Sequence, residues 1–358
     1  MAAPAITRDL ARPGLAGRLR SRTVAAAAIG FALLLVILVV GVGLGTVRIA
    51  PLEALGVVLS RTFGLDIGAT WTDATETIVW ELRLPRVLSG MVIGAGLAVA
   101  GAAFQGILRN PLADPFVLGT ASGAALGAAV AILLPVTVVF VAFGLLHGLA
   151  FAGALLAAVL VLRLGGASGS GNLTRLLLTG YAIGSILTAL LTMAMYVSGA
   201  ELRQIFSFLL GGLGGSSWTR LLVATPLIVG SCVLIAARAR SLDGMLLGDS
   251  AARHLGIDVG HERNILLGLA SMATAAGVAI SGLIGFVGLV VPHGVRLVVG
   301  PSARRVLPLS AIFGAVLLSS ADLVARIAGD IPVGVVMAAV GAPFFLFLLS
   351  RRRGGYEL

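Results

Sequence analysis

Long apolar stretches separated by short polar ones dominate the chain. The stretches between charged residues cover 23–47, 87–108, 115–162, 176–200, 221–237, 264–295, 306–321 and 331–350. A helix needs about 20 residues to cross the hydrocarbon of a bilayer, so 115–162 and 264–295 each have room for two helices. The pattern therefore predicts an all-α, polytopic membrane protein with ten transmembrane helices.

The composition agrees with this class. Charged residues make up 11% of the chain and hydrophobic residues 58%, whereas a soluble domain has about 25% charged residues. An aqueous globule is therefore excluded. The single cysteine, Cys232, allows no internal disulfide. The four histidines, His147, His254, His261 and His293, lack metal-ligand spacing, so we predict no metal site.

The basic residues, all of them arginine, predict the orientation of the chain. If the N-terminus is cytoplasmic, seven of the 25 arginines lie outside, which leaves eighteen inside. The seven are Arg48, Arg61, Arg83, Arg86, Arg203, Arg220 and Arg326. The positive-inside rule then places both termini in the cytoplasm. This asymmetry and attraction to anionic membrane lipid explain the net charge of +10, with no need for nucleic acid.

The chain divides into a basic cytoplasmic tail over 1–22, a transmembrane domain over 23–350 with a cytoplasmic loop at 241–258, and a cytoplasmic tail over 351–358. The basic start resembles a signal peptide, but the apolar run is too long and lacks a small-residue cleavage site, so a retained first helix is expected. The phosphate-binding loop of P-loop ATPases needs a Gly-Lys pair, and a chain without lysine cannot form it.

The most charged stretch lies between Arg238 and Arg263. Within it the sequence predicts a short helix over 251–255, capped by Asp249 or Ser250 and ended by Gly256. A short exposed helix between membrane spans would be suited to transmit force from a soluble partner. An ordinary solvated loop is the alternative that composition leaves open.

A polar stripe runs along the apolar stretch 176–200. Its members recur at three- or four-residue steps and so share one helix face: Tyr181, Ser185, Thr188, Thr192 and Tyr196. Such a stripe lines either a helix contact or a water-filled path. Serine and threonine can also bond to their own helix backbone, so the pattern leaves both alternatives open.

Two prolines are expected to bound helices. Pro85 suits a first helical turn, so the second transmembrane helix is predicted to begin there. Pro292 is expected to interrupt the short helix that ends near Arg296.

Arg83 and Arg86 then stand on the expected outer side, against the positive-inside rule, and at a helix start, where the helix dipole disfavours cations. Both placements call for a compensating partner. Glu81 or another outer carboxylate of the chain is one candidate, and a partner molecule is the other.

Six strings in order support a resemblance that spans nearly the whole chain. They are RLPR at 83–86, NPLADP at 110–115, LLGGLGGSSW at 209–218, LGDSAARHLGI at 247–257, GFVGLVVPH at 285–293 and IPVGVVMAAVGAP at 331–343. Together they resemble the permease subunits of ABC importers for iron chelates (siderophores), haem and cobalamin.

The resemblance implies a type II ABC importer permease fold in a bacterial or archaeal plasma membrane. It also implies a homodimer with a second permease copy, two ATPase subunits on the cytoplasmic side and a substrate-binding protein outside. ATP and Mg would be bound by the ATPase, so this chain is expected to be a transport subunit without a cofactor or catalytic residues.

The resemblance also implies roles for particular residues, with Leu255 as the buried and Arg253 as the polar contact to the ATPase. The coupling residues would be Gly248, Asp249, Ser250, Arg253, Leu255 and Gly256. The translocation path would be lined by Tyr181, Ser185, Thr188, Thr192 and Tyr196. The cytoplasmic gate would consist of Asn172, Leu173 and Thr174. The binding protein would dock on Arg83, Arg86 and Arg326.

The cargo expected from abundance within the family is a ferric siderophore, with haem and cobalamin as alternatives. A rival of another class is an ion-coupled secondary transporter, which would need ionisable groups in mid-membrane. Only Asp322, near the outer end of the ninth helix, approaches that position. A channel would need a wide polar lining, and no helix offers more than one stripe.

Overall fold

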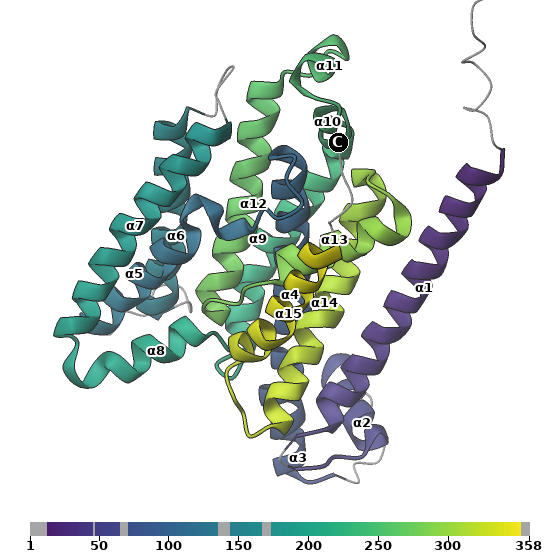
Figure 1. Ribbon diagram of the computed structural model, residues 1–358. Helices are drawn as coiled ribbons and strands as arrows, with labels where there is room; N and C mark the ends of the chain where they lie inside the picture. Colours follow the sequence, from purple (N-terminus) through teal and green to yellow (C-terminus); the bar gives the residue numbers. More distant parts are fainter. Residues whose placement is uncertain (1–12, 46, 65–70, 135–143, 167–172, 352–358) are drawn as a thin grey trace, which may run out of the picture.

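The computed structural model describes residues 13–45, 47–64, 71–134, 144–166 and 173–351, which form helices joined by turns (Figure 1). In chain order the elements are α1 (Pro13–Gly43), α2 (Pro51–Phe63), α3 (Asp73–Thr77), the π-helix η1 (Ile78–Arg83), α4 (Leu84–Ile107), the 3₁₀-helix η2 (Pro115–Leu118), α5 (Thr120–Leu133), α6 (Gly144–Gly165), α7 (Leu173–Val197), the 3₁₀-helix η3 (Gly199–Glu201), α8 (Leu202–Leu210), α9 (Trp218–Ala237), α10 (Ala239–Leu246), α11 (Asp249–His254), α12 (Val259–Ser281), α13 (Val287–Val299), α14 (Ala303–Ile327) and α15 (Val333–Arg351).

Seven helical segments among the described residues are long and apolar enough to cross a membrane. Three further apolar helices, α5, α13 and α15, are shorter. The all-α membrane fold is therefore as predicted, while the count of ten full-length spans is not reproduced. The first two of the shorter helices lose length because η2 and Gly119 occupy 115–119 and a turn occupies 282–286 of the two long apolar stretches.

The helix α4 is the centre of the fold. It packs against α9, α12, α13 and α14, and most of its residues are buried. Two glycines allow the closest approaches: a Cβ on Gly94 would overlap the carbonyl of Gly314 in α14, and one on Gly101 would overlap that of Gly288 in α13. Small residues at helix contacts are how membrane helices pack closely.

The helix that contains Pro85 begins earlier than predicted. It starts at Asp73, capped by the Thr72 side chain, and continues through α3 and η1 into α4. In the wide turn of η1, Leu84 N donates to Val79 O, so the carbonyl that faces Pro85 is that of Trp80. Trp218 Nε1 donates to this oxygen at 2.8 Å. The widened turn and the indole compensate for the missing proline N–H, which is why Pro85 is tolerated inside the helix.

The helix α13 likewise runs through Pro292, where the sequence predicts an interruption. Proline removes the N–H that would bond to the carbonyl four residues earlier, Gly288 O. Gln105 Nε2 of α4 donates to Gly288 O at 3.1 Å and to Leu289 O at 3.3 Å. Arg296 in turn donates to Gln105 Oε1, which holds the amide in this orientation.

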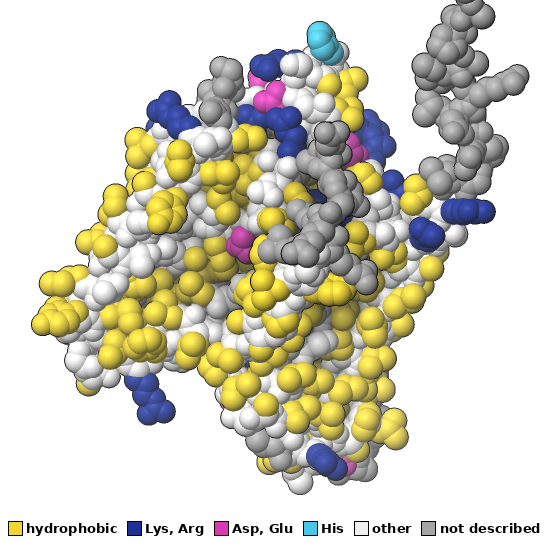
Figure 2. All heavy atoms as spheres, viewed as in Figure 1, with side chains coloured by type: hydrophobic (Ala, Val, Ile, Leu, Met, Phe, Trp, Pro, Cys, Tyr) yellow, Lys and Arg dark blue, Asp and Glu magenta, His cyan; other side chains and the backbone are white. Residues whose placement is uncertain are grey.

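The two ends of the molecule differ in what they carry. The α11 end consists of α10, α11 and the adjoining turns, and the α2 end consists of α2, α3 and the neighbouring ends of α1, η1 and α14 (Figure 1). Figure 2 shows charged side chains gathered at the α11 end and apolar ones over the flanks. The two ends and the exposed face of α7 are therefore the candidate surfaces for binding partners.

Candidate functional sites

The helix α11 forms only in part as predicted. It ends before Gly256, which has the left-handed φ of +79° typical of a residue that follows a helix. Neither Asp249 nor Ser250 caps it. Its N-cap is Gly248 at φ +103°, and Asp249 is the first helical residue. The capping prediction is wrong because the carboxylate of Asp249 bonds to arginines instead.

Asp249 joins three elements. Arg109 Nη2, at the end of α4, donates to Oδ1 at 2.7 Å, and Arg263 Nη2, on α12, donates to Oδ2 at 2.9 Å. Burial alone would raise the pKa of Asp249, but the hydrogen bond from Arg263 and the charges of Arg263, Arg109 and Arg253 lower it. The carboxylate is therefore ionised at physiological pH and ties α11 to α4 and α12.

A second carboxylate ties the same loop to α14. Asp243, on α10, accepts hydrogen bonds at 3.0 Å from Ser302 Oγ and at 2.6 Å from Ala303 N. Ala303 is the first residue of α14, so Asp243 caps that helix from a distance. The loop formed by α10 and α11 is thus connected by side-chain hydrogen bonds to α12, to α14 and to the turn that follows α4.

The surface of α11 offers contacts for a soluble molecule. Leu255 is 65% exposed and Leu247 is exposed as well, whereas Ala252 is fully buried and anchors the helix. Arg253 and His254 are also exposed. Sequence reasoning singled out Arg253 and Leu255, whose role in coupling remains a prediction, and did not single out Leu247, Asp243, Arg109 or Arg263. The last three act through contacts that no local pattern encodes.

The polar stripe on α7 faces outward from the chain. All five of its residues are exposed, while Leu187 is half-buried and Leu191 is buried. A groove of about 680 Å³ lies between α7 and the η2–α5 segment. Four stripe residues line it: Tyr181, Ser185, Thr188 and Thr192. Tyr196 is exposed outside this groove.

The hydroxyls of the stripe are bonded within the protein. Ser185 Oγ donates to Tyr181 O at 2.9 Å, and Thr192 Oγ1 donates to Thr188 O at 2.9 Å. Thr188 Oγ1 donates to Gly184 O at 2.8 Å and lies 3.1 Å from Ser122 Oγ of α5. Because these serine and threonine hydroxyls donate to backbone carbonyls of α7, this helix face is polar without a water molecule at every hydroxyl. The outward orientation is what a path shared with another subunit would need.

Two of the three predicted gate residues, Leu173 and Thr174, form the start of α7. Leu173 is the first residue of α7 and packs, half-buried, against the main core, and Thr174 is exposed. Asn172 lies outside the described residues. The gate role of this segment remains a prediction.

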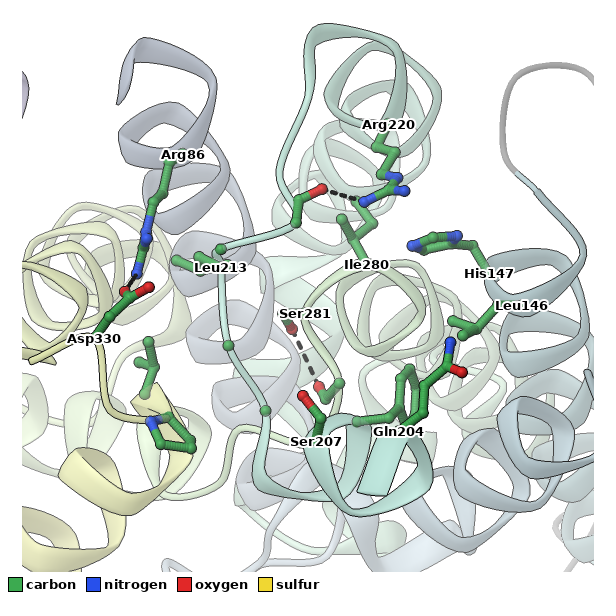
Figure 3. A pocket seen from close by; sticks show the side chains of 18 of the residues that line it. Arg86, Leu146, His147, Gln204, Ser207, Leu213, Arg220, Ile280, Ser281 and Asp330 are labelled. Carbon is green, nitrogen blue, oxygen red and sulfur yellow. Dashed lines mark hydrogen bonds and ion pairs between the residues drawn. The ribbon is translucent and has the colours of Figure 1, made fainter. Parts of the chain in front are cut away.

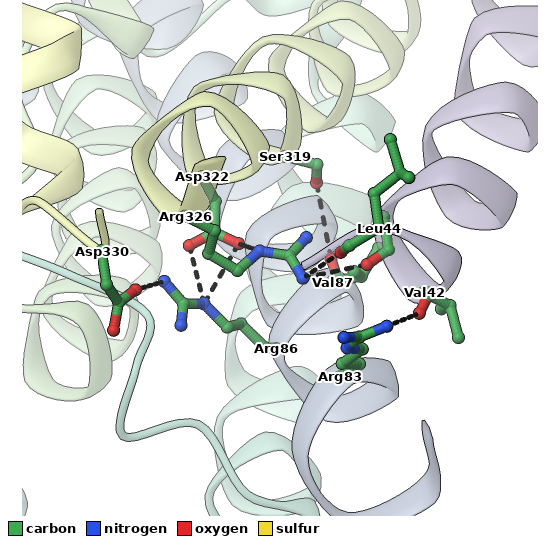
Figure 4. Close-up of polar contacts among 10 residues, drawn as sticks. Val42, Leu44, Arg83, Arg86, Val87, Ser319, Asp322, Arg326 and Asp330 are labelled. Atoms are coloured by element: carbon green, nitrogen blue, oxygen red, sulfur yellow. Dashed lines mark hydrogen bonds and ion pairs between the residues drawn. The ribbon is translucent and has the colours of Figure 1, made fainter. Parts of the chain in front are cut away.

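At the α2 end, two arginines hold the C-terminal turn of α1 (Figure 4). Arg83 Nη1 donates to Val42 O and Gly43 O, each at 2.9 Å, and its Nη2 donates to Val47 O. Arg326 Nη1 donates to Gly41 O at 2.9 Å. The last carbonyls of a helix lack partners within it and carry partial negative charge, so these cations satisfy the end of α1.

A buried carboxylate compensates Arg326 and the neighbouring Arg86. Asp322 is 1% exposed, accepts from Arg86 Nε at 2.9 Å and lies 3.2 Å from Arg326 Nε (Figure 4). Arg86 Nη2 also donates to Asp330 Oδ1 at 2.8 Å. The compensating partners are thus within the chain, but they are Asp322 and Asp330 rather than the exposed Glu81.

This geometry corrects the expectation that Arg83 and Arg86 stand at a helix start. The helix begins ten residues before Arg83, at Asp73, so the dipole argument does not apply. Arg83 is buried, Arg86 and Arg326 are largely buried, and all three already bind groups of this chain. A docking role for these arginines remains a prediction. It would require a surface that all three of them line.

The structure does bring the three arginines together around a cavity of about 280 Å³, which Gly45, Gly214 and Asp330 also line. A second cavity, of about 470 Å³, shares Arg86, Gly214 and Asp330 with it. Its remaining lining mixes polar groups, among them His147, Gln204 and Arg220, with apolar side chains (Figure 3). The Arg86–Asp330 ion pair stands where the two cavities meet. Sequence reasoning missed Asp330 and the second cavity.

Comparison with known proteins decides the family. Residues 33–351 match the FecCD transport family. The chain belongs to this family. It is 44% identical over 281 residues to the cobalamin import system permease protein BtuC of Halobacterium salinarum, covering 78% of this chain and 75% of that protein. It is 40% identical over 310 residues to the hemin transport system permease protein HmuU of Yersinia pestis, covering 84% of this chain and 92% of that protein.

A solved structure agrees with the FecCD assignment. A chain described as an inward-facing conformation of a metal-chelate type ABC transporter superposes with a TM-score of 0.76, at 28% identity, over 91% of this chain and 99% of that one. The resemblance drawn from the six strings is therefore confirmed. This FecCD chain is a multi-pass membrane protein and an ABC importer permease.

Proposed function

We propose that this chain is the membrane permease of an ATP-driven importer for a metal chelate, which passes along the α7 stripe at the axis of a homodimer by alternating access. The observation that carries the proposal is the outward-facing stripe and its groove of about 680 Å³. Apolar side chains on α7 beside the stripe are exposed as well, including Ile186, Leu190 and Met193. An apolar face with a polar stripe suits a second copy of the chain across a wet path.

The cargo we propose is a ferric siderophore, on the ground that such chelates are the commonest substrates within the family. The relatives named for cobalamin and haem support the second candidate, one of those two compounds. The test is uptake by the complete importer in sealed vesicles, with a labelled ferric siderophore, labelled cobalamin and haem compared at equal concentration. ATP-dependent uptake of cobalamin or haem alone would overturn the siderophore assignment.

Energy for transport is proposed to enter at the α11 end through two ATPase subunits, which would bind ATP and Mg. The exposed Leu255 and Leu247 provide apolar contact, and Asp249 and Asp243 link the loop to α4, α12 and α14. The rival of an ion-coupled transporter is less well supported. Its best candidate carboxylate, Asp322, is held by Arg86 and Arg326.

The substrate-binding protein is proposed to dock at the α2 end, over the cavity of about 280 Å³ that Arg83, Arg86 and Arg326 line. Acidic side chains of the binding protein would enter this cavity. Removing the positive charge of Arg86 should then weaken docking, and the effect should be largest at low salt.

A further inference from the structure

We propose that Asp330 is a built-in competitor at the docking cavity: it occupies Arg86 in the undocked permease, and a carboxylate of the docking protein replaces it. The inference rests on the proposed docking role of the cavity and adds a regulating residue to it. Asp330 would keep the cavity closed to weak or non-specific anions, so that only a partner presenting several acidic groups displaces it.

The first observation is the unequal burial of the two carboxylates on Arg86. Asp322 is buried and bonds to Nε, whereas the side chain of Asp330 is 65% exposed and bonds to Nη2. The side chain of Arg86 is itself only 14% exposed. Arg86 thus has one permanent partner inside the protein and one at the surface that an external group can reach.

The second observation is the position of Asp330 in the chain. It stands in the turn between α14 and α15 with a φ of +60°, a left-handed conformation that is uncommon outside glycine and tolerated best by Asn and Asp. The neighbouring Ile331 N donates to Ala325 O at 3.1 Å and so fixes the turn from behind. The carboxylate is therefore presented at the cavity by an ordered turn, and its side chain can leave without unfolding a helix.

The third observation is the charge balance of the cavity. Three guanidinium groups, those of Arg83, Arg86 and Arg326, stand against Asp322 and Asp330. If Asp330 leaves, two positive charges are uncompensated by any carboxylate described at the cavity. Arg326 Nη2, on a side chain only 8% exposed, has no hydrogen-bond partner among the described residues. A buried N–H without a partner is costly, and the groups of this chain satisfy Arg326 only in part.

The occupant that fits is an acidic side chain of a protein. Small-molecule sites commonly enclose about 300–1,000 Å³, so a cavity of about 280 Å³ is small for a whole metal chelate. Its arginines match the charge of aspartate or glutamate, and Arg pairs with carboxylates in favourable geometry. The cavity also lies at an end of the molecule, where a soluble protein can reach it.

The chain carries its own reporter for this site. Its three tryptophans, Trp71, Trp80 and Trp218, all belong to the α2 end or the segment packed against it. Trp80 and Trp218 contact each other at a tilt of 40°, with ring centroids 4.9 Å apart, and Trp80 lies three residues before Arg83. The purified permease in detergent would be titrated with glutarate, a small dicarboxylate, and tryptophan emission recorded. Sodium chloride at matched ionic strength controls for general salt effects.

Asp330→Asn removes the competing charge and keeps a residue that tolerates positive φ. We expect it to lower the glutarate concentration at half-response about two- to five-fold, the range expected for an exposed ion pair. Asp330→Glu, which keeps the charge, should bind glutarate as weakly as the parent. Glu81→Gln removes an exposed carboxylate of the same end that does not pair with Arg86, and should also match the parent.

Arg86→Gln separates this inference from the docking proposal. If it abolishes the glutarate response while Asp330→Asn binds no tighter than the parent, the competitor role is overturned and the docking cavity stands. If Arg86→Gln responds like the parent, the cavity is not a carboxylate site and both proposals fail. A thermal melting curve for each variant shows whether it is folded. If Asp330→Asn melts at a lower temperature than the parent, Asp330→Glu is the second variant at this position with which its glutarate response is compared.

Discussion

Each end of the molecule is built around one carboxylate that holds two arginines, at least one of which comes from another helix. At the α11 end Asp249 binds Arg109 and Arg263, and at the α2 end Asp322 binds Arg86 and Arg326. The chemistry is the same, but the setting is not. The side chain of Asp249 is 28% exposed, whereas that of Asp322 is 1% exposed.

The difference in burial indicates different tasks. Because Asp249 is partly exposed, water can replace some of the hydrogen bonds between its carboxylate and the two arginines. This cluster of ion pairs therefore mainly fixes the orientation of α11. No water replaces Asp322, since its loss would leave two largely buried guanidinium groups without a carboxylate inside the helix packing. The surface cluster is therefore expected to matter for coupling, and the buried cluster for folding.

The largest effect is expected from Asp322→Ala. Breaking a buried ion pair by removing one partner costs about 3–5 kcal/mol, so this variant should melt far below the parent or fail to accumulate. The measurement is the melting temperature of the purified permease. Asp249→Ala is the matched variant at the other end. Equal melting of the two variants would show that burial does not distinguish the clusters.

Leu255→Asp is expected to separate partner binding from folding. Leu255 is exposed, so the permease should fold normally, but an unpaired charge buried at the ATPase contact costs a few kcal/mol. Retention of the ATPase on the immobilised permease is the measurement. Leu52→Asp, which changes an equally apolar exposed residue at the α2 end, is the control and should retain the ATPase. Full retention by Leu255→Asp would place the coupling contact elsewhere.

Asp249→Asn should have a smaller effect on stability, about 1 kcal/mol, because partly exposed ion pairs contribute little. The folded pKa of Asp249 is below its ordinary value of 3.8. Its stabilisation is therefore complete above that value and is lost as the pH falls through the folded pKa. Melting temperatures of parent and variant should differ by a constant amount from pH 8 to pH 5 and converge in stronger acid. A difference in melting temperature that changes near pH 6 would contradict the lowered pKa of Asp249.

The smallest structural change tests the region between the two ends. In a Cys232→Ser background, Thr188→Cys should react quickly with a water-soluble thiol reagent, since Thr188 lines the α7 groove. Leu187→Cys and Leu191→Cys should react slowly, because these side chains are half-buried and buried. Labelling at equal rates would mean that the stripe is not in contact with water.

Local pattern predicted which candidate residues would be exposed. Arg253 and Leu255 belong to a charged segment that stands out between apolar stretches, and helical periodicity places the α7 stripe on one face; the structure exposes them all, while their roles remain predictions. The cap itself was mistaken. Asp249 suits an N-cap by type, but Arg109, 140 residues earlier, takes its carboxylate, and no local pattern contains that competition.

Composition and periodicity alone determined that this is an all-α membrane protein, and its six strings pointed to the FecCD family. These properties follow from neighbours along the chain, because a bilayer imposes length and polarity on each helix separately. Only the tertiary structure decided how Pro85 and Pro292 fit inside helices and which groups compensate Arg83, Arg86 and Arg326. Those answers come from Trp218, Gln105, Asp322, Asp330 and the end of α1. Apart from Asp322, which is four positions from Arg326 on the same helix, these groups lie at least 36 positions away from the residues they serve. A buried polar group takes whichever partner the fold brings within reach.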